Sequence, residues 1–563
     1  MSIARPLARV ALGGLFFAVL VAQPSGSVGA AAGAAPSSSA NERIMVVGLG
    51  DSLSHGTLNA TNNSVNTENA YLQRVVDKLS TVVNLRFTQP LYDFTEKRIQ
   101  PFIIPTNFAV DGADAFSMEG IEYYKRVGAT ESFLSPGLLC DRGFLTAKAD
   151  DYDKVMYPVN LLAGKTVSQV DAAVWALTQG VKLQRASKAL GVLWIGNNDS
   201  SLAALGGGGA NPQFQPIPFD QVKSELKPGL RYLLSFGESS GDVSFAPYSM
   251  ASIERNLTDL SDFTMQLDHL LNRLTTETAG STADIDWLVI TLPYYSSVGY
   301  LMDSEDIEFY IQKYIPGYSV PKSFKRVAKQ GKPITHPLKG DRVALLTFGF
   351  MVSLAATGHS AADINAVLDE GGVQRDGLVM SEAEQQFIMT RIDGFNAAIQ
   401  SVSASYGPKV HVLDVGGYLN SALTGDTPIV IDGRQLTRKW SRGGGFSLDG
   451  VHPGYTGHSL IANYVLQHVN GIFGWSAPTY DLAEVLATDP YVDHDGDGWV
   501  AGPDDPTQGI TSLLYMMRDG DDADVSQEAQ IPADVWERIS DILLKELLRV
   551  PGVAKEARRV GIR

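Results

Sequence analysis

The stretch that decides the fold is Gly48-Leu49-Gly50-Asp51-Ser52-Leu53-Ser54-His55-Gly56. Residues 43–47, directly before it, are a β-rich apolar run of the kind that forms a buried strand. Residues 71–79, a short distance after it, carry apolar side chains at helical spacing. A strand, a glycine-flanked turn with a serine and then a helix can lift a nucleophile to the carboxyl edge of a parallel sheet. The same residues also fit an ordinary connection after a strand, so the role of Ser52 depends on motifs further along the chain.

Strands and helices alternate downstream of this stretch. Short apolar runs predict further strands at 191–195, 284–293 and 409–415. Helical spacing predicts helices over 167–190, 252–276, 382–404 and 457–468. This alternation predicts a mostly parallel sheet with helices on both faces. We find no internal repeat of fixed period in the sequence.

Two loops carry groups that can donate hydrogen bonds to a ligand. Gly112 follows Asn107 after a short apolar run, and a glycine beside small residues lets a backbone N–H approach a ligand closely, although a simple turn fits as well. The predicted strand at 191–195 ends in Gly-Asn-Asn-Asp, and sites in open α/β sheets form at such strand ends. Asn198 can therefore supply a fixed amide donor, and we expect Asp199 to brace the loop that carries it.

An acid and a histidine lie just before the last predicted helix. Asp449 and His452 are three residues apart, so their side chains can meet on one face, and a serine hydroxyl needs such an adjacent base to become nucleophilic. Two alternatives stay open. His452 can be a surface histidine before Pro453, or His458 can lie against Ser52 instead, although no acid has the matching spacing to His458.

Taken together, these motifs resemble the four sequence blocks of the SGNH/GDSL hydrolases, and they follow the family's order. The matching residues are Gly50-Asp51-Ser52-Leu53, Gly112 in an Asn-x-Ala-x-x-Gly context, Gly196-x-Asn198-Asp199 and Asp449-x-x-His452-Pro453. The resemblance covers roughly residues 43–470, with large insertions between the third and fourth blocks. It implies a three-layer, flavodoxin-like α/β fold with a parallel central sheet. It also implies hydrolysis of carboxylic esters through an acyl-enzyme intermediate.

The same resemblance implies a role for each site residue. Ser52 is expected to be the nucleophile, His452 the general base, and Asp449 the acid that holds the imidazole. The expected oxyanion hole consists of the backbone N–H groups of Ser52 and Gly112 and the side-chain amide of Asn198. No cofactor is implied for catalysis, and the substrate is expected to be a small-molecule or lipid ester. The alternative from another class is an inactive scaffold that acts as a secreted binding module.

A second serine motif competes with the first. Residues 237–241 (Gly-Glu-Ser-Ser-Gly) fit the nucleophile motif of the α/β-hydrolases, which would make Ser239 the nucleophile. That motif requires a helix directly after the serine, and residues 242–247 are not helical in pattern. The sequence also lacks a His-Gly-Gly-Gly oxyanion segment. We therefore keep Ser239 only as the alternative.

Composition limits the partners of the chain. Its 563 residues carry a formal net charge of −17, and the pI is about 5.0, which argues against nucleic acid as a main partner. Cys140 is the one cysteine, so the chain can form neither an intrachain disulfide nor a cysteine metal cluster. The N-terminus has two arginines, a short apolar core and small residues before position 31. This pattern predicts a signal peptide over 1–30 and a disordered lead-in over 31–42. We expect a secreted or periplasmic protein without a transmembrane segment after signal removal.

The predicted organisation is a hydrolase domain over 43–475, with insertions at about 204–250 and 299–372, followed by a small acidic module over 476–563. Within that module, residues 493–504 resemble an EF-hand or dockerin-type calcium loop. The expected ligands of a structural Ca²⁺ are Asp493, Asp495, Asp497, Trp499 and Asp504. Asp504 replaces the usual bidentate glutamate, and a solvated acidic linker is the alternative.

The second insertion contains the apolar run 343–352. Because it begins beside a strand end, we expect it to form one wall of the pocket and to favour medium acyl chains over acetyl. The alternative is that this run fills the core of the insertion itself.

Overall fold

The computed structural model describes residues 42–58, 62–93, 97–122, 132–133, 151–205, 248, 250, 253–254, 257–327, 339–356, 358–369, 379–496, 498 and 500. All of them belong to one compact unit, Ser38–Arg563. The predicted signal peptide, the Ser239 motif and Cys140 lie outside the described residues, as does most of the first insertion.

Five parallel strands form the central sheet, in the order β10-β6-β5-β1-β2. Their bounds are β1 Arg43–Gly50, β2 Asn84–Arg86, β5 Lys188–Trp194, β6 Asp284–Ile290 and β10 Val410–Leu413. Numbered along the chain, these five strands have the order 2-1-3-4-5, which is that of doubly wound, flavodoxin-like sheets. The predicted α/β class with a parallel central sheet is confirmed.

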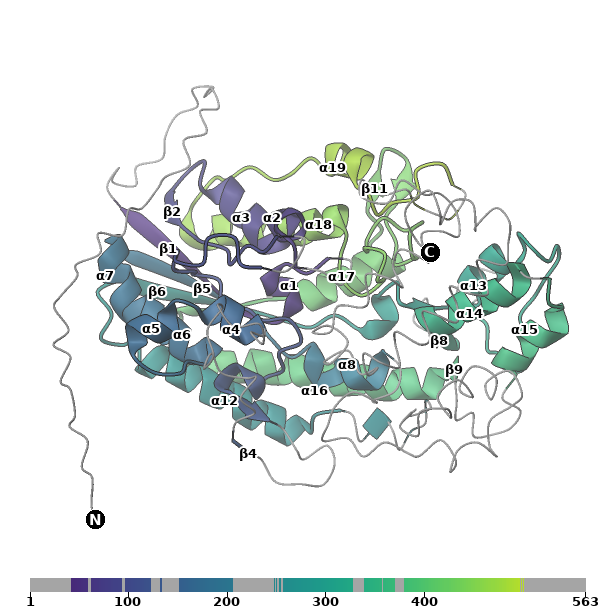
Figure 1. Cartoon of the computed structure of the whole chain (residues 1–563), viewed down its shortest axis with the longest axis horizontal. Coiled ribbons are helices and arrows are strands. Elements are labelled where there is room, and N and C mark those ends of the chain that lie inside the picture. The colour runs from purple at the N-terminus through teal and green to yellow at the C-terminus, as the bar shows by residue number, and fades with distance from the viewer. Residues whose placement is uncertain are drawn as a thin grey trace, which may run out of the picture. The chain divides into compact units, whose positions relative to one another are not determined.

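Helices cover both faces of this sheet, so the unit has three layers (Figure 1). On one face α3 (Tyr71–Leu79) packs against α18 (Tyr455–Phe473). On the other face α12 (Leu260–Thr276) packs between α6 (Gln169–Trp175) and α16 (Glu382–Ser405). Because helices shield both faces, β1 is almost entirely apolar and buried, as expected for a central parallel strand.

Short elements connect these layers. They are α1 Ser52–His55, α2 Ser64–Asn69, α4 Asp151–Met156, α5 Val159–Ala163, a π-helical turn Ala176–Gly180, α7 Val181–Gln184, α8 Asn198–Ala204, α17 Val415–Thr424 and α19 Leu482–Thr488. Two-stranded pairs are β3 Ile121–Glu122 with β4 Ser132–Phe133, and β11 Val430–Ile431 with β12 Arg434–Gln435. Two 3₁₀ turns lie at Ser117–Glu119 and Tyr295–Ser297.

The helix predicted over 167–190 is too long. The helical segment ends at Gln184, where Arg185 has the left-handed conformation (φ 55°) that closes a helix. Strand β5 then begins at Lys188, because residues 188–190 are needed to pair with the first residues of β1. The apolar side chains of Ala189 and Leu190 fit a helix and a buried strand equally well, so the spacing could not separate them.

The second insertion forms its own small unit (Figure 1). It contains β7 Leu301–Met302 and β8 Arg342–Ala344, which pair antiparallel, with α13 Ser304–Ile311, α14 Leu345–Ala356 and α15 Ala361–Leu368. On its other side β8 pairs antiparallel with β9 Val379–Met380, which follows the insertion. The apolar run 343–352 becomes part of β8 and α14. Phe348 on α14 is fully buried, with its ring 5.0 Å from Tyr310 and 6.3 Å from Trp440. Phe348 therefore packs in a core that the insertion shares with the segment around Trp440.

The structure shows no boundary at residue 475. The Asn463 side chain on α18 donates to the carbonyl of Tyr480 (2.9 Å) and accepts from its N–H (2.7 Å). Helix α19 also packs on α18. The described beginning of the predicted acidic module, residues 476–496, therefore belongs to the α/β unit. In the part of the chain that the structure describes, no helix combines the length and the apolar character needed to cross a membrane.

Candidate active site

Ser52 lies in a tight turn at the carboxyl end of β1. Gly50 has φ +138°, and a Cβ there would lie 2.0 Å from the carbonyl oxygen of Trp194, so only glycine fits. Asp51 caps α1, because its Oδ1 accepts the N–H of Leu53 at 3.1 Å. Ser52 is the first residue of that helix and is 8 % exposed. This turn lies between β1 and β5, the switch point where ligands bind in doubly wound sheets.

Asp449 and His452 form the acid–histidine pair that the sequence predicts. Their Oδ2 and Nδ1 atoms are 2.7 Å apart. The other carboxylate oxygen of Asp449 accepts the backbone N–H groups of Val451 (2.8 Å) and His452 (2.9 Å), so the carboxylate cannot turn away from the ring. The imidazole therefore donates through Nδ1–H to Asp449, which leaves Nε2 as the atom that can accept a proton.

Nearby carboxylates make the imidazole of His452 a stronger base. Burial by itself lowers the pKa of His452, but the charge and hydrogen bond of Asp449, with the charges of Asp111 and Asp51, raise it above its ordinary value. Burial acts to raise the pKa of Asp449, yet its interactions with His452 hold it below its ordinary value. The pair is thus arranged to stabilise an imidazolium.

The Ser52 turn and the loop that carries His452 lie near each other although they are far apart in the sequence. Asp51, the residue before Ser52, interacts with the charge of His452. Among the described residues no hydrogen bond joins the Ser52 hydroxyl to His452. Catalytic hydrogen bonds are often long in free enzymes and shorten when substrate binds, so this geometry is compatible with a nucleophile–base pair.

Gly112 lies at the same edge of the sheet. The segment before it runs alongside β1, with hydrogen bonds from Phe108 N to Gly48 O (2.8 Å) and from Val110 N to Gly50 O (3.1 Å). Gly112 itself has φ +72°.

Asn198 at the start of α8 faces the loop that carries Gly112. Its Nδ2 donates to the carbonyl of Ala113 at 3.1 Å, and its Oδ1 accepts the hydroxyl of Ser201 at 3.0 Å. A side-chain amide has two N–H donors, so one remains for a ligand. Asp199, fully buried, accepts the N–H of Ala115 at 3.0 Å. It therefore ties the loop that carries Asn198 to the segment that follows Gly112.

Asn197 also belongs to the candidate site, which the sequence does not predict. Its Nδ2 donates to Oδ2 of Asp51 at 2.8 Å, and its carbonyl accepts the hydroxyl of Tyr295 at 2.8 Å. Asn197 thus ties the end of β5 to the residue before the nucleophile. The only sequence signal for it is its place in a polar loop after a strand, which Asn198 shares.

Two further carboxylates lie near the histidine. Burial raises the pKa of Asp51 to about 7, against the hydrogen bond from Asn197. Burial also raises the pKa of Asp111, which accepts hydrogen bonds from Asn62 (3.3 Å) and Thr57 (3.2 Å). Asp51, Asp111 and Asp449 therefore interact electrostatically with one imidazole.

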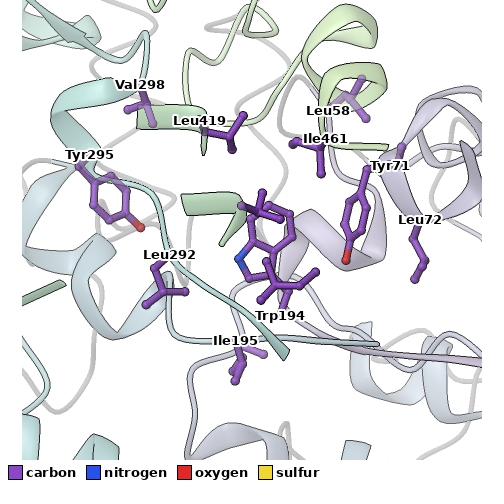
Figure 2. Packing of buried hydrophobic residues seen from close by; sticks show 14 of the residues in the cluster. Leu58, Tyr71, Leu72, Trp194, Ile195, Leu292, Tyr295, Val298, Leu419 and Ile461 are labelled. Carbon is purple, nitrogen blue, oxygen red and sulfur yellow. The ribbon is translucent and has the colours of Figure 1, made fainter. Parts of the chain in front are cut away.

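His458 takes a structural role in this arrangement. It is fully buried, its Nδ1 accepts the backbone N–H of Tyr71 at 3.1 Å, and its ring stacks on that of Tyr71. Burial lowers the pKa of His458 to about 3, so it stays neutral. The geometry thus favours His452 over His458 as the base. Figure 2 shows Trp194, at the end of β5, surrounded by apolar side chains from several elements, among them Tyr71 and Ile461.

The calcium loop is described only in part. Asp493 is buried, and its two carboxylate oxygens accept the N–H groups of Gly496 and Gly498, each at 2.7 Å. Asp495 is exposed, and the three remaining expected ligands (Asp497, Trp499 and Asp504) lie outside the described residues. Within the described residues, no three acidic, histidine or cysteine side chains gather as a metal site. The bound calcium therefore stays a prediction.

Fold and site together define a doubly wound α/β protein with a serine, an acid–histidine pair and an amide at the carboxyl edge of its sheet. No protein-family model matches the chain, and neither a curated protein nor a solved structure is significantly similar to it. The family resemblance therefore rests on the motifs and the geometry described above.

Proposed function

We propose that the protein is a serine hydrolase of carboxylic esters, with the site layout of the SGNH/GDSL hydrolases. The observation that carries the proposal is the buried 2.7 Å pair of Asp449 and His452 beside the Ser52 turn. A surface histidine before a proline would need neither the carboxylate nor the two backbone N–H groups that fix it. The strand order and the position of Ser52 at the switch point support the same conclusion.

In this proposal Ser52 Oγ attacks the ester carbonyl carbon while Nε2 of His452 takes its proton. Asp449 keeps Nδ1 protonated and stabilises the imidazolium that forms. The imidazolium then protonates the leaving alkoxide, and an acyl group remains on Ser52. Water attacks this acyl-enzyme with His452 again as base, which releases the acid and restores the serine.

Three donors are proposed to stabilise the tetrahedral oxyanion. The N–H of Ser52 is in the first turn of α1, where backbone N–H groups have no partner within the helix. Asn198 supplies its second amide hydrogen. The N–H of Gly112, in the loop that Asn198 contacts, is the third donor.

Labelling with a fluorophosphonate tests the proposal directly. The parent protein should react covalently and lose activity on p-nitrophenyl esters, whereas Ser52→Ala should neither react nor hydrolyse. Ser239→Ala is the matched control, because it removes the serine of the competing motif. Labelling that survives in Ser52→Ala and disappears in Ser239→Ala would overturn the assignment. No labelling of the folded parent would favour the inactive binding module.

We also propose a location for the protein and a structural metal ion. The N-terminal pattern supports export to a secreted or periplasmic location. The spacing of residues 493–504 supports a structural Ca²⁺ in the acidic region, outside the residues that carry the chemistry.

A further inference from the structure

A carboxylate from the acidic C-terminal segment, which we define as residues 477–496, lies at the start of α18. Asp489 is fully buried, and its Oδ2 accepts two hydrogen bonds from Thr456, one from the backbone N–H (2.7 Å) and one from the hydroxyl (2.8 Å). Its Oδ1 accepts the N–H of Tyr491 at 3.0 Å, which fixes the carboxylate in this orientation. Asp489 therefore joins two segments that are 33 residues apart in the sequence.

Helix α18 lacks a cap of its own. Its N-cap residue is Gly454, which has no side chain to accept the N–H groups of the first turn. Thr456 is the second residue of the helix, and the N–H at that position is one that a capping aspartate usually accepts. Asp489 thus does from another segment what an N-cap aspartate does, and its charge also suits the positive end of the helix. A Cβ on Gly454 would lie 3.2 Å from Asp489 Oδ2, so glycine there lets the carboxylate approach.

The same helix start holds the histidine loop. His452 lies two residues before Gly454, and its carbonyl accepts the N–H of Ser447 at 2.9 Å. The N–H of Gly454 donates to the carbonyl of Gly445 at 3.1 Å. A shift in the first turn of α18 would therefore move the backbone that carries His452.

The C-terminal segment also contacts the chain that follows the nucleophile. The hydroxyl of Tyr491 donates to Asn66 at 3.2 Å, and Asn66 donates to the carbonyl of Leu58 at 2.8 Å. Leu58 lies six residues after Ser52. The ring of Tyr491 packs edge-on against Tyr455, the first residue of α18, with centroids 5.7 Å apart. One short segment thus contacts both α2, in the chain that follows Ser52, and the first turn of α18, in the chain that follows His452.

We infer that Asp489 is a positioning residue for His452: the C-terminal segment fixes the start of α18 and, through it, the imidazole against the Ser52 turn. The catalytic part of this inference rests on the proposed esterase function. The structural part, that Asp489 orders the first turn of α18, does not.

The catalytic test compares Asp489→Ala with Asp481→Ala in the full-length protein. Asp481 is the matched control, since it lies in the same segment and caps α19 through the N–H of Ala483 (2.8 Å). On a p-nitrophenyl ester, Asp489→Ala should lower kcat by about tenfold or more with KM nearly unchanged, because misplaced catalytic groups lose rate rather than binding. Asp489→Asn should recover most of kcat, because an amide oxygen still accepts the Thr456 N–H. A parent-like kcat in Asp489→Ala overturns the inference.

Amide hydrogen exchange separates this inference from the proposed function. If the parent hydrolyses no ester, the exchange of residues 454–458 still decides the structural part. Asp489→Ala should speed their exchange by about fivefold, the usual scale for losing a helix cap, while Asp481→Ala leaves it unchanged. Equal exchange in Asp489→Ala and the parent overturns the inference. If Asp489→Ala does not fold, Thr456→Val is tested in its place. The loss of one hydrogen bond in Thr456→Val should lower kcat by about threefold or more. Unchanged kcat and unchanged exchange in Thr456→Val would also overturn the inference.

Discussion

Two buried charge clusters in the described structure differ in how they are balanced. The first, which we call the edge cluster, consists of Asp51, Asp111 and Asp449 around His452. Three carboxylates there share one histidine, and burial raises the pKa of two of them.

The second, the insertion cluster, lies where the second insertion meets the segment before Asp449. Asp303 and Asp306 at the start of α13 contact three cations, Arg438, Lys439 and Arg442. Burial by itself raises the pKa of Asp303, but the charges of Lys439 and Arg438 hold it well below its usual range.

Under the proposed function, the difference separates a cluster that supports chemistry from one that supports structure. In the insertion cluster every carboxylate has a nearby cation, so the charges offset one another and the loop is fixed. In the edge cluster acids exceed cations, so protons are held there at neutral pH, where an acid–base site needs them. Such an excess of buried carboxylates lowers the free energy of unfolding, which substitutions in the two clusters can measure.

The largest expected effect is the loss of the histidine of the edge cluster. His452→Ala should lower kcat/KM for an ester by about 10⁴-fold or more, because nucleophile and base act as a unit. His468→Ala, which removes an exposed histidine on α18, the helix that follows His452, is the control and should stay close to the parent. A His452→Ala variant with activity within tenfold of the parent would remove the edge cluster from catalysis.

The insertion cluster should respond in stability instead. Asp303→Asn removes one of its two carboxylates and leaves buried cations uncompensated, which should cost about 3–5 kcal/mol in the free energy of unfolding. Urea denaturation followed by circular dichroism measures this value. A loss below about 1 kcal/mol would show that the cations are solvated and that the cluster contributes little.

Asn198→Ala should lower kcat by about 10²- to 10³-fold through the loss of one oxyanion donor. Its urea midpoint should stay near that of the parent, since Asn198 is partly exposed and makes few contacts. Unchanged kcat in a folded variant would exclude Asn198 from the oxyanion hole. A large loss of stability would instead assign it to the support of the Gly112 loop.

Replacing an aspartate by asparagine should stabilise the fold in the edge cluster, whereas the same replacement in the insertion cluster should destabilise it. The pKa of Asp51 is 3.8 when unfolded and about 7 in the fold, so the folded state holds this proton more tightly and stability falls as pH rises between these values. Above pH 7, the free energy of unfolding of Asp51→Asn should therefore exceed that of the parent by about 1 kcal/mol or more. It should also decrease less steeply as the pH rises. Asp303, with its lowered pKa, contributes stability that is lost as pH falls. A destabilised Asp51→Asn at pH 8 would show that the edge cluster is balanced.

The smallest expected effect concerns calcium. Chelation should lower the melting temperature by about 2 °C or more, because binding energy of the ion is folding energy for residues near the loop. Asp495→Ala should abolish this dependence, and Ser52 should still react with a fluorophosphonate. Identical melting curves with and without chelator would favour the acidic linker.

Several parts of the fold follow from the sequence because they depend on near neighbours. The apolar run before Gly48 and the need for glycine at position 50 are local properties, and they place Ser52 at the end of a strand. The alternation of strands and helices predicts the parallel sheet. Asp449 and His452 are three residues apart, so a single turn brings them together.

Other parts depend on packing between distant segments. The run 343–352 has the same composition whether it lines a pocket or fills a core, and the surrounding insertion, with Tyr310 and Trp440 on Phe348, decides that it packs in a core. The end of helix α7 was similarly decided by the pairing of residues 188–190 with β1.

The sequence by itself determined the sheet, the nucleophile turn and the acid–histidine pair, since each is encoded in a short window of periodicity or spacing. Only the tertiary structure decided which polar groups meet across the chain. Asn197 reaches Asp51 from 146 residues away, and Asp489 reaches Thr456 across what the sequence suggested was a domain boundary. An asparagine or aspartate in a loop has no local signal for its partner, because the partner is set by how helices and strands pack around the sheet.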